Sequence, residues 1–331
     1  MTETSAGKSI WKSVLIAVLL IAGLITAVLH FGDLKKFADL ARSAKPGWLA
    51  AAVVLQLITY MCVAFGWSMV LRAGHSPLPV RRLFPLAISK LFADQAVPAA
   101  GMSGNVLMID RLIASGVPRG NAAAALIVSM IGYYAAYALL ALVALVLLWW
   151  HSRATPLLAG TISIFLLVAF AIPAFALWLR RRGAQPLPPL LMQIGFIRRL
   201  LETVGSAPID LVVDRALILR VGLMNGLVFV ADAATLAVCL LALRYSEPFA
   251  SSYIALIMAS IATTLAPLPL GLGAFEAVSI GMLRLLGVPF EPALSATLLL
   301  RGFTLWLPLL PGFLLVRRWR VKRSPDKAKS A

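Results

Sequence analysis

A single broken stretch near the carboxyl end places the strongest limit on the fold. Residues 266–276 read A-P-L-P-L-G-L-G-A-F-E and interrupt an apolar segment that would otherwise resemble a membrane span. Two prolines and two glycines so close together cannot continue a helix. Hydrocarbon offers no water to the backbone groups that a break sets free, so the break must lie inside protein or line a wet cavity. Glu276 follows at once, and broken helices with an acid at the break are typical of transporter binding sites.

An earlier stretch has the same pattern. Residues 97–105 read V-P-A-A-G-M-S-G-N and also lie between apolar segments. A shift of 171 positions superposes the two regions and pairs Pro98 with Pro269, Asn105 with Glu276, and the Gly-Val-Pro of 116–118 with that of 287–289. Three matches at one offset indicate an internal repeat. Two unrelated kinked helices are the alternative interpretation.

The rest of the chain is apolar enough for a membrane protein. Hydrophobic residues make up 61% of it, against about 45–50% in a soluble domain. Six segments are long enough to span a bilayer, namely 11–29, 48–71, 121–150, 156–179, 217–243 and 293–316. The arms around the breaks, at 84–97 and 106–115 and at 253–266 and 277–286, are too short. We therefore predict an all-α polytopic membrane protein with about six full transmembrane helices and two re-entrant helical hairpins.

Basic residues predict the orientation of the chain. The net charge is +17, but the Lys and Arg residues cluster at the ends of apolar runs, which favours the positive-inside rule over nucleic-acid binding. If both termini, the loops at 72–83 and 117–120 and the segment 180–216 are cytoplasmic, that side carries 19 Lys and Arg and the other side six. We expect a multi-pass protein of the cytoplasmic membrane with a basic cytoplasmic tail at 317–331.

The repeat and the topology together predict an inverted arrangement. One transmembrane domain covers 1–316, with a first repeat at 48–150, a connecting span and cytoplasmic segment at 151–216, and a second repeat at 217–316. Because one full span separates the two copies, the second copy is turned over. The first hairpin then enters from the cytoplasm and the second from outside, and their tips meet near the bilayer midplane, which is the plan of many secondary transporters.

Ionisable residues in the middle of a membrane are costly and usually face a cavity. Glu276 is the strongest candidate for substrate binding or translocation, and its alternative role is to cap a helix. Arg301 could pair with Glu276 or hold a lipid phosphate through its planar fork. Asp232 is interpreted as the partner of a buried cation or, second, as a proton carrier.

The remaining candidates surround the first break or form the breaks themselves. Lys90 and Asp94 are four residues apart on one helical face and could pair with each other. Arg111 is placed to meet a phosphate headgroup at the cytoplasmic mouth, or is simply a solvated interfacial charge. The set is completed by Asn105, which the repeat pairs with Glu276, and by the helix-breaking residues Pro98, Pro269, Gly271 and Gly273.

The stretch at 267–276, Pro-x-Pro-x-Gly-x-Gly-x-x-Glu, resembles the P-G-G-L-G-x-x-E motif of the flippase-like membrane domain of lysylphosphatidylglycerol synthases, with Leu270 where that family often has glycine. The break at 98–105, followed by Arg111, is similar to the family's weaker first motif. The family includes stand-alone proteins of this size, some associated with hopanoid-lipid biosynthesis. The resemblance implies translocation of a lipid, with membrane lipids as ligands and lipid-biosynthesis enzymes as protein partners. We expect the soluble aminoacyl-transferring domain of the synthases to be absent.

Three functions fit these features. The first is a flippase that moves a phospholipid or isoprenoid-type lipid across the membrane, and the second is a secondary transporter of a small solute or ion. The third is an accessory subunit of a lipid-modifying enzyme. The sequence contains no HExxH, catalytic triad or phosphate-binding glycine loop, so we expect neither enzymatic activity nor a cofactor or metal.

The predicted topology can be tested with single cysteines after Cys62 and Cys239 are replaced. Cysteines at Ser76 and Gln185 should be protected from a membrane-impermeant thiol reagent in intact cells, whereas those at Ser152 and Ser246 should react. Labelling of Ser76 and Ser246 from the same side would contradict the inverted repeat.

Overall fold

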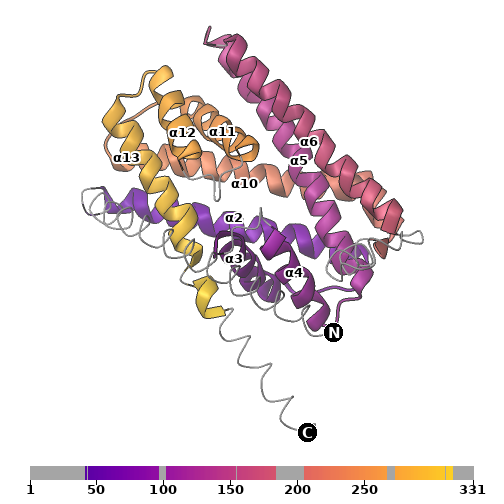
Figure 1. Cartoon of the computed structure of the whole chain (residues 1–331). Coiled ribbons are helices and arrows are strands. Elements are labelled where there is room, and N and C mark those ends of the chain that lie inside the picture. Colours follow the sequence, from indigo (N-terminus) through magenta and orange to yellow (C-terminus); the bar gives the residue numbers. More distant parts are fainter. Residues whose placement is uncertain are drawn as a thin grey trace, which may run out of the picture.

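The computed structural model describes residues 42, 44–96, 102–153, 155–183, 205–266, 273–309 and 311–315. All regular structure in these residues is helical (Figure 1). Five helices are long and apolar enough to cross a membrane, which makes the chain a multi-pass membrane protein. They are α2 (Pro46–Ala73), α5 (Arg119–Trp150), α6 (Pro156–Gly183), α10 (Arg215–Ala242) and α13 (Phe290–Arg301), which continues through the π-turn η2 (Gly302–Trp306). The sixth predicted span, at 11–29, lies outside the described residues.

Proline begins many of these helices. Pro46 and Pro156 are the first residues of α2 and α6, and Pro118, Pro248 and Pro289 directly precede α5, α11 and α13. Proline suits this position because its fixed φ is helical and its missing N–H would have no partner there. The prolines therefore define where these five helices start.

Two pairs of shorter helices flank the predicted breaks. The first pair is α3 (Val80–Ala96) with α4 (Met102–Ala114), and the second is α11 (Phe249–Leu265) with α12 (Ala274–Leu285). The 17 residues of α3 rise about 26 Å at 1.5 Å each, less than the roughly 30 Å of a hydrocarbon core. Both first arms begin about four residues earlier than predicted, because their charged or polar first turn is helical too. The segments 97–101 and 267–272 lie outside the described residues.

Both ends of each helix pair lie on one side of the molecule. Asn121, at the start of α5, donates to the carbonyl of Gly74 at 2.5 Å and to Ser76 Oγ at 3.0 Å, so the loops that flank the α3–α4 pair lie together. Likewise, the Tyr245 hydroxyl donates to the Gly287 carbonyl at 3.4 Å, beside the ends of the α11–α12 pair. The helix pairs are therefore hairpins that enter and leave on the same side.

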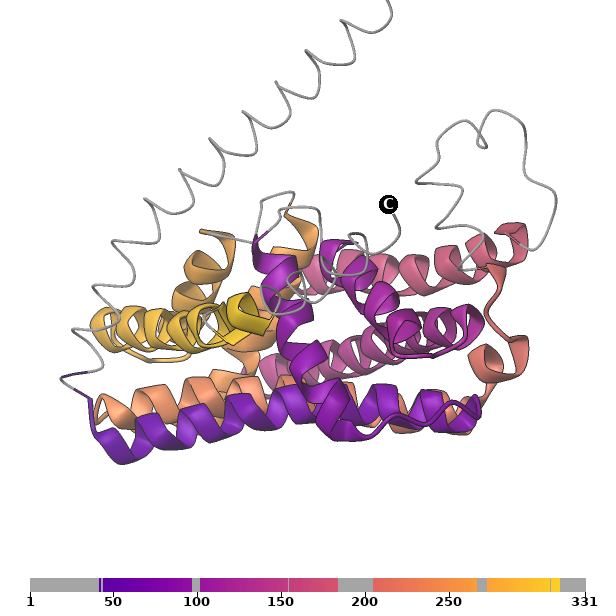
Figure 2. The ribbon, with the colours of Figure 1, turned by 90° about the horizontal axis from the view of Figure 1, so that it is seen from below.

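Helices α2 and α10 pack side by side along their length and run in opposite directions (Figure 2). The Lys45 N–H, before α2, donates to the carbonyl of Ala242 at the end of α10, at 3.0 Å. Farther along, Gly66 of α2 lies beside Val221, near the start of α10. Each hairpin follows the end of one of these two helices, so the two hairpins enter the protein from opposite ends.

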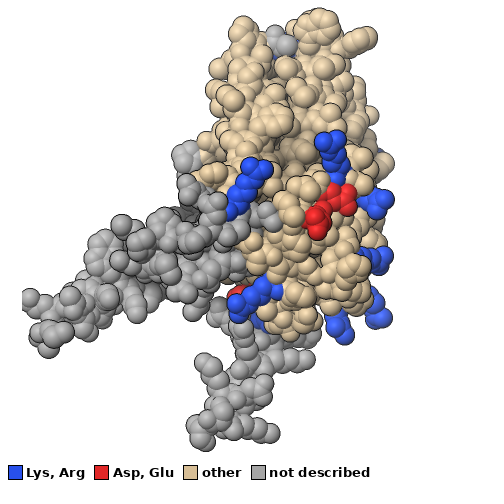
Figure 3. All heavy atoms as spheres, turned by 90° about the vertical axis from the view of Figure 1, so that its right-hand side faces the viewer, with Lys and Arg blue, Asp and Glu red and all other residues tan. Residues whose placement is uncertain are grey.

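The outer surface of the helices fits a hydrocarbon environment. Large apolar side chains on α5 and α6 are exposed, including Leu139, Leu167 and Phe170, which are 62–72% accessible. Figure 3 shows the described charged side chains in the middle and lower part of one face, and its upper part is almost entirely uncharged. A short helix, α9 (Ile209–Val213), directly precedes α10.

Helices α5 and α10 approach each other closely at a pair of glycines. A Cβ atom added to Gly132 would lie 2.9 Å from the backbone nitrogen of Gly222, which cannot move without moving α10. By contrast, a Cβ atom on Gly160 of α6 would meet no atom within 4 Å. Small residues that let backbones approach are typical of helix contacts in membranes.

We predict that Gly132→Ala lowers the free energy of unfolding by about 1–3 kcal/mol, the usual cost of overpacking. The matched control, Gly160→Ala, should leave it unchanged or slightly higher, because alanine is the better helix former. Thermal unfolding of the purified protein in detergent measures both. Equal stability of the two variants would contradict the close contact of α5 with α10.

Candidate functional site

The second break ends in a helix start that depends on Gly273 and Glu276. Gly273 has φ of +82°, a conformation that residues with a Cβ atom rarely adopt, and it directly precedes α12. Glu276 lies in the first turn of α12, and its Oε2 atom accepts the N–H of Gly273 at 2.7 Å. The carboxylate therefore satisfies one of the backbone donors that the break leaves without a helical partner.

The other oxygen of the Glu276 carboxylate pairs with the side chain of an arginine. Arg301 Nε donates to Glu276 Oε1 at 2.7 Å, and the two side chains are only 13% and 20% exposed. The guanidinium also lies over the ring of Phe275, 4.9 Å from its centroid. The pairing of Arg301 with Glu276 was one of the two predicted roles of the arginine. Glu276 thus acts as a helix cap and as an ion-pair partner at once.

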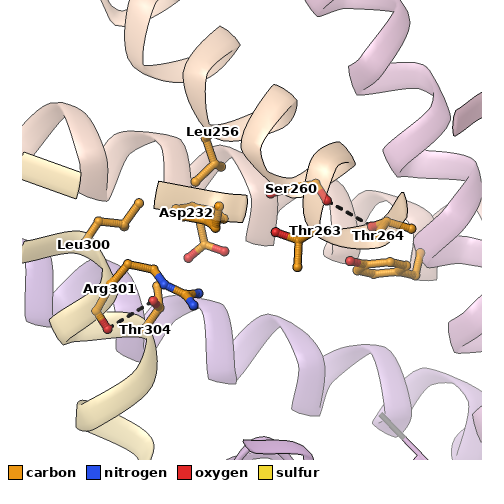
Figure 4. A pocket seen from close by; sticks show the side chains of 10 residues that line it. Asp232, Leu256, Ser260, Thr263, Thr264, Leu300, Arg301 and Thr304 are labelled. Carbon is orange, nitrogen blue, oxygen red and sulfur yellow. Dashed lines mark hydrogen bonds between the residues drawn. The ribbon is translucent and has the colours of Figure 1, made fainter. Parts of the chain in front are cut away.

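A recess of about 240 Å³ opens beside this ion pair. Its polar lining comes from α5, α10, α11, α13 and η2, and in Figure 4 the carboxylate of Asp232 and the guanidinium of Arg301 point toward the same space. Hydroxyl groups supply most of the remaining polar surface, from Tyr133, Ser260, Thr263, Thr264 and Thr304. The apolar lining is Leu256, Phe275 and Leu300. The recess therefore offers one cation, one anion and several neutral hydrogen-bonding groups.

Asp232 is held by an amide. Gln56 Nε2 donates to Asp232 Oδ1 at 2.9 Å and to Thr235 Oγ1 at 3.1 Å, across the contact between α2 and α10. Gln56 is 2% exposed. Within the described part of the chain Asp232 takes part in no ion pair, so the structure gives it a neutral partner where the sequence suggested a cation.

A similar arrangement is present at the first break. Lys90 Nζ lies 2.7 Å from Asp94 Oδ2, which confirms the predicted pairing. The other oxygen of Asp94 accepts the N–H of Gly104 in the first turn of α4, at 2.8 Å. A carboxylate paired with a cation therefore caps the second helix of each hairpin. The cap comes from Asp94 of the preceding helix and not from Asn105, the residue that the repeat pairs with Glu276.

The predicted site residues separate into three groups. Glu276, Arg301, Asp232 and Gly273 surround the second break and its recess, whereas Lys90, Asp94 and Asn105 lie at the first break. Arg111 is in the last turn of α4, toward the loop end of the first hairpin. The predicted residues Pro98, Pro269 and Gly271 lie outside the described residues.

Several functional candidates were missed from the sequence. Gln56 holds Asp232, and Ser260, Thr263 and Thr264 form a polar face on α11. The spacing of these three residues, at positions i, i+3 and i+4 of an apolar helix, is a signal that could have identified them. A buried amide in an apolar span, such as Gln56, is a second signal of the same kind.

The fold and the site together define a multi-pass helical membrane protein with a polar recess at a broken helix. Its sequence matches the family described as the lysylphosphatidylglycerol synthase TM region over residues 14–312, and the chain belongs to this family. No curated protein matches the sequence. The family membership confirms the resemblance seen in the motif at 267–276.

The ion pair can be measured with a double-mutant cycle of Glu276→Gln and Arg301→Gln. Glutamine at 276 can still accept the Gly273 N–H, so the cycle isolates the ion pair from the cap. We expect a coupling free energy of about 0.5–3 kcal/mol, as for other contacting residues. The control cycle of Glu276→Gln with Asp94→Asn should be additive, because these residues belong to different hairpins. Thermal unfolding in detergent provides the measurement, and an additive Glu276–Arg301 cycle would contradict the pairing.

Proposed function

We propose that this protein translocates lipids, moving the polar headgroup of a phospholipid or isoprenoid-type lipid through the recess while the lipid tails remain in the bilayer. The observation that carries the proposal is the Arg301 guanidinium, held by Glu276 at a broken helix and facing a polar recess within an apolar helical body. A guanidinium binds phosphate through two parallel hydrogen bonds, which suits a lipid headgroup. The family membership supports the same function.

In this proposal the helices α2–α5 and the helices α10–α13 are inverted copies of each other. A shift of 171 residues takes the start of α5, Arg119, onto the start of α13, Phe290, and Gly116 onto Gly287, both of which have positive φ. The starts of α2 and α3 coincide with those of α10 and α11 to within two residues. The antiparallel packing of α2 with α10 and the opposite entry of the two hairpins support the inversion. Transporters with this plan bind substrates where the broken helices meet.

The distribution of basic residues supports the proposed orientation. Arg72, Arg81, Arg82, Arg119 and Arg215 lie at the end of the molecule where α2 ends and α5 and α10 begin. Lys45, Arg153 and Arg244 lie at the other end. In our proposal the first end faces the cytoplasm, and the protein resides in the cytoplasmic membrane.

The proposed cycle depends on competition for one guanidinium. When no headgroup is present, Glu276 neutralises Arg301, which avoids an uncompensated buried charge. An entering phosphate replaces the carboxylate on Arg301, and Glu276 keeps its bond to the Gly273 N–H. When the headgroup leaves, the ion pair forms again. In this proposal no covalent bond is made or broken, so the chain acts as a transporter and not as an enzyme.

Two other functions remain as alternatives. A secondary transporter of a small solute would use the same recess, since its roughly 240 Å³ suits a small polar group. An accessory subunit would deliver lipid to a lipid-biosynthesis enzyme without moving it across the membrane. Reconstitution separates the three functions, because only a translocase changes the leaflet of a labelled lipid by itself.

The test is a translocation assay in proteoliposomes with a panel of headgroup-labelled fluorescent phospholipids and an isoprenoid phosphate. We predict that Glu276→Gln keeps the fold but loses most translocation, because glutamine cannot neutralise Arg301. Arg301→Lys should be impaired as well, since an ammonium group cannot copy the planar fork. Arg153→Lys, the same change in a loop at the edge of the molecule, is the control and should retain wild-type rates.

Thermal stability of each variant verifies folding. Wild-type translocation by stable Glu276→Gln protein would contradict the proposed mechanism and leave Glu276 as a helix cap. The absence of translocation for every lipid, in a wild-type preparation that takes up a labelled solute, would favour the second function.

A further inference from the structure

We propose that Asp232 is a proton-binding site and that its protonation drives the movement of the headgroup through the recess. The coupling part rests on the translocation proposed above. The proton-binding part stands by itself, because it concerns the environment of one carboxyl group.

The environment of Asp232 suits a group that gains and loses a proton. It lies well inside the 28-residue helix α10, and its only hydrogen bond among the described residues comes from the amide of Gln56 at 2.9 Å. An ionised carboxylate that is removed from water without a cation is costly, and its protonated form avoids this cost. The carboxyl group also faces the recess, which gives a proton a path to water.

A second observation concerns the neighbouring residue Tyr60. Tyr60, one helical turn after Gln56 on α2, is 4% exposed, and its hydroxyl has no hydrogen-bond partner within the described part of the protein. It lies close enough to Asp232 for the two to interact electrostatically. Such hydroxyls are also present on Ser68, Ser129 and Tyr137 in the described residues, and the one at Tyr60 calls for a hydrogen-bond partner in some state of the protein. A protonated carboxyl, or the water that delivers its proton, would supply that partner.

Charged and titratable groups around Asp232 define how the proton can be coupled to transport. Tyr60 approaches from α2 and Tyr133 from α5, and both are phenols, which carry no charge near neutral pH. Arg301 of α13 shares the recess, and it is the neighbouring cation whose partner, Glu276 of α12, a phosphate would displace. The polar groups of α11 in the recess are hydroxyls and carry no charge.

The coupling follows from charge balance in the recess. With Asp232 protonated, the single positive charge of Arg301 is available to Glu276 or to a phosphate. When the proton leaves to water, the new negative charge of Asp232 attracts Arg301 and weakens its hold on the phosphate. Proton uptake on one side and release on the other therefore binds and releases the headgroup in turn. The step moves one proton between water and one carboxylate oxygen and needs no other reactant.

The first test is infrared spectroscopy of the full chain in lipid nanodiscs, which detects the carbonyl stretch of a protonated carboxyl group. We expect a band that disappears as the pH rises and is missing from Asp232→Asn. The band should persist in Glu276→Gln, the matched control. In Gln56→Leu, which removes the amide that positions Asp232, the pH at which the band disappears should shift. The proposal would be overturned if the wild type shows no titrating band, or if Asp232→Asn still shows it.

The second test is the translocation assay with an imposed proton gradient. We expect the gradient to raise the wild-type rate several-fold, and the ratio of rates with and without the gradient to fall to one in Asp232→Asn. A wild-type rate that follows a sodium gradient, or neither gradient, would overturn the coupling while leaving translocation intact. If no lipid is translocated at all, the proposed function fails, and the infrared band still decides whether Asp232 binds a proton.

Discussion

The need to satisfy backbone N–H groups at the helix breaks is the constraint on which this structure depends. The first N–H groups of a helix have no partner within it, and hydrocarbon provides none. Each break is therefore accompanied by a carboxylate that accepts one of these groups, Glu276 for Gly273 and Asp94 for Gly104. Arg301 and Lys90 in turn neutralise these two part-buried carboxylates, so both ion pairs follow from the same constraint. The polar groups proposed to handle a substrate are those that make the breaks possible.

The sequence was sufficient to predict the five long helices that the structure describes and the positions between which each helix pair is interrupted. Both results depend on local chemistry, namely the length of apolar runs and the incompatibility of clustered proline and glycine with a helix. The Lys90–Asp94 pair was predictable for the same reason, because four residues of helix bring the two side chains together. The starts of α3 and α11 were placed too late because apolar character was used as the criterion and proline as a helix start was overlooked.

Contacts between segments that are distant in the chain could not be predicted from the sequence. Gln56 and Asp232 are 176 residues apart, and they meet only because α2 and α10 pack antiparallel in one particular register. The sequence shows that Asp232 is a costly residue in a span, but it cannot identify which neighbour compensates for that cost. The capping of α4 had the same limit, because only the geometry of the hairpin brings Asp94 to the N–H of Gly104, ten residues farther along the chain.

The π-turn after Arg301 has a consequence for how one helix serves two halves of the molecule. Residues 301 and 312 are eleven positions apart and would point in nearly the same direction from a regular α-helix. The wider turn at Gly302–Trp306 separates their directions by about a quarter of a turn. Arg301 can then face α12, while Gly312 packs against Phe92 of α3, and Figure 1 shows the chain running on from α13 toward the first hairpin. Deleting a single residue from this turn would restore regular winding, and Gly312 would lose its alignment with Phe92 of α3.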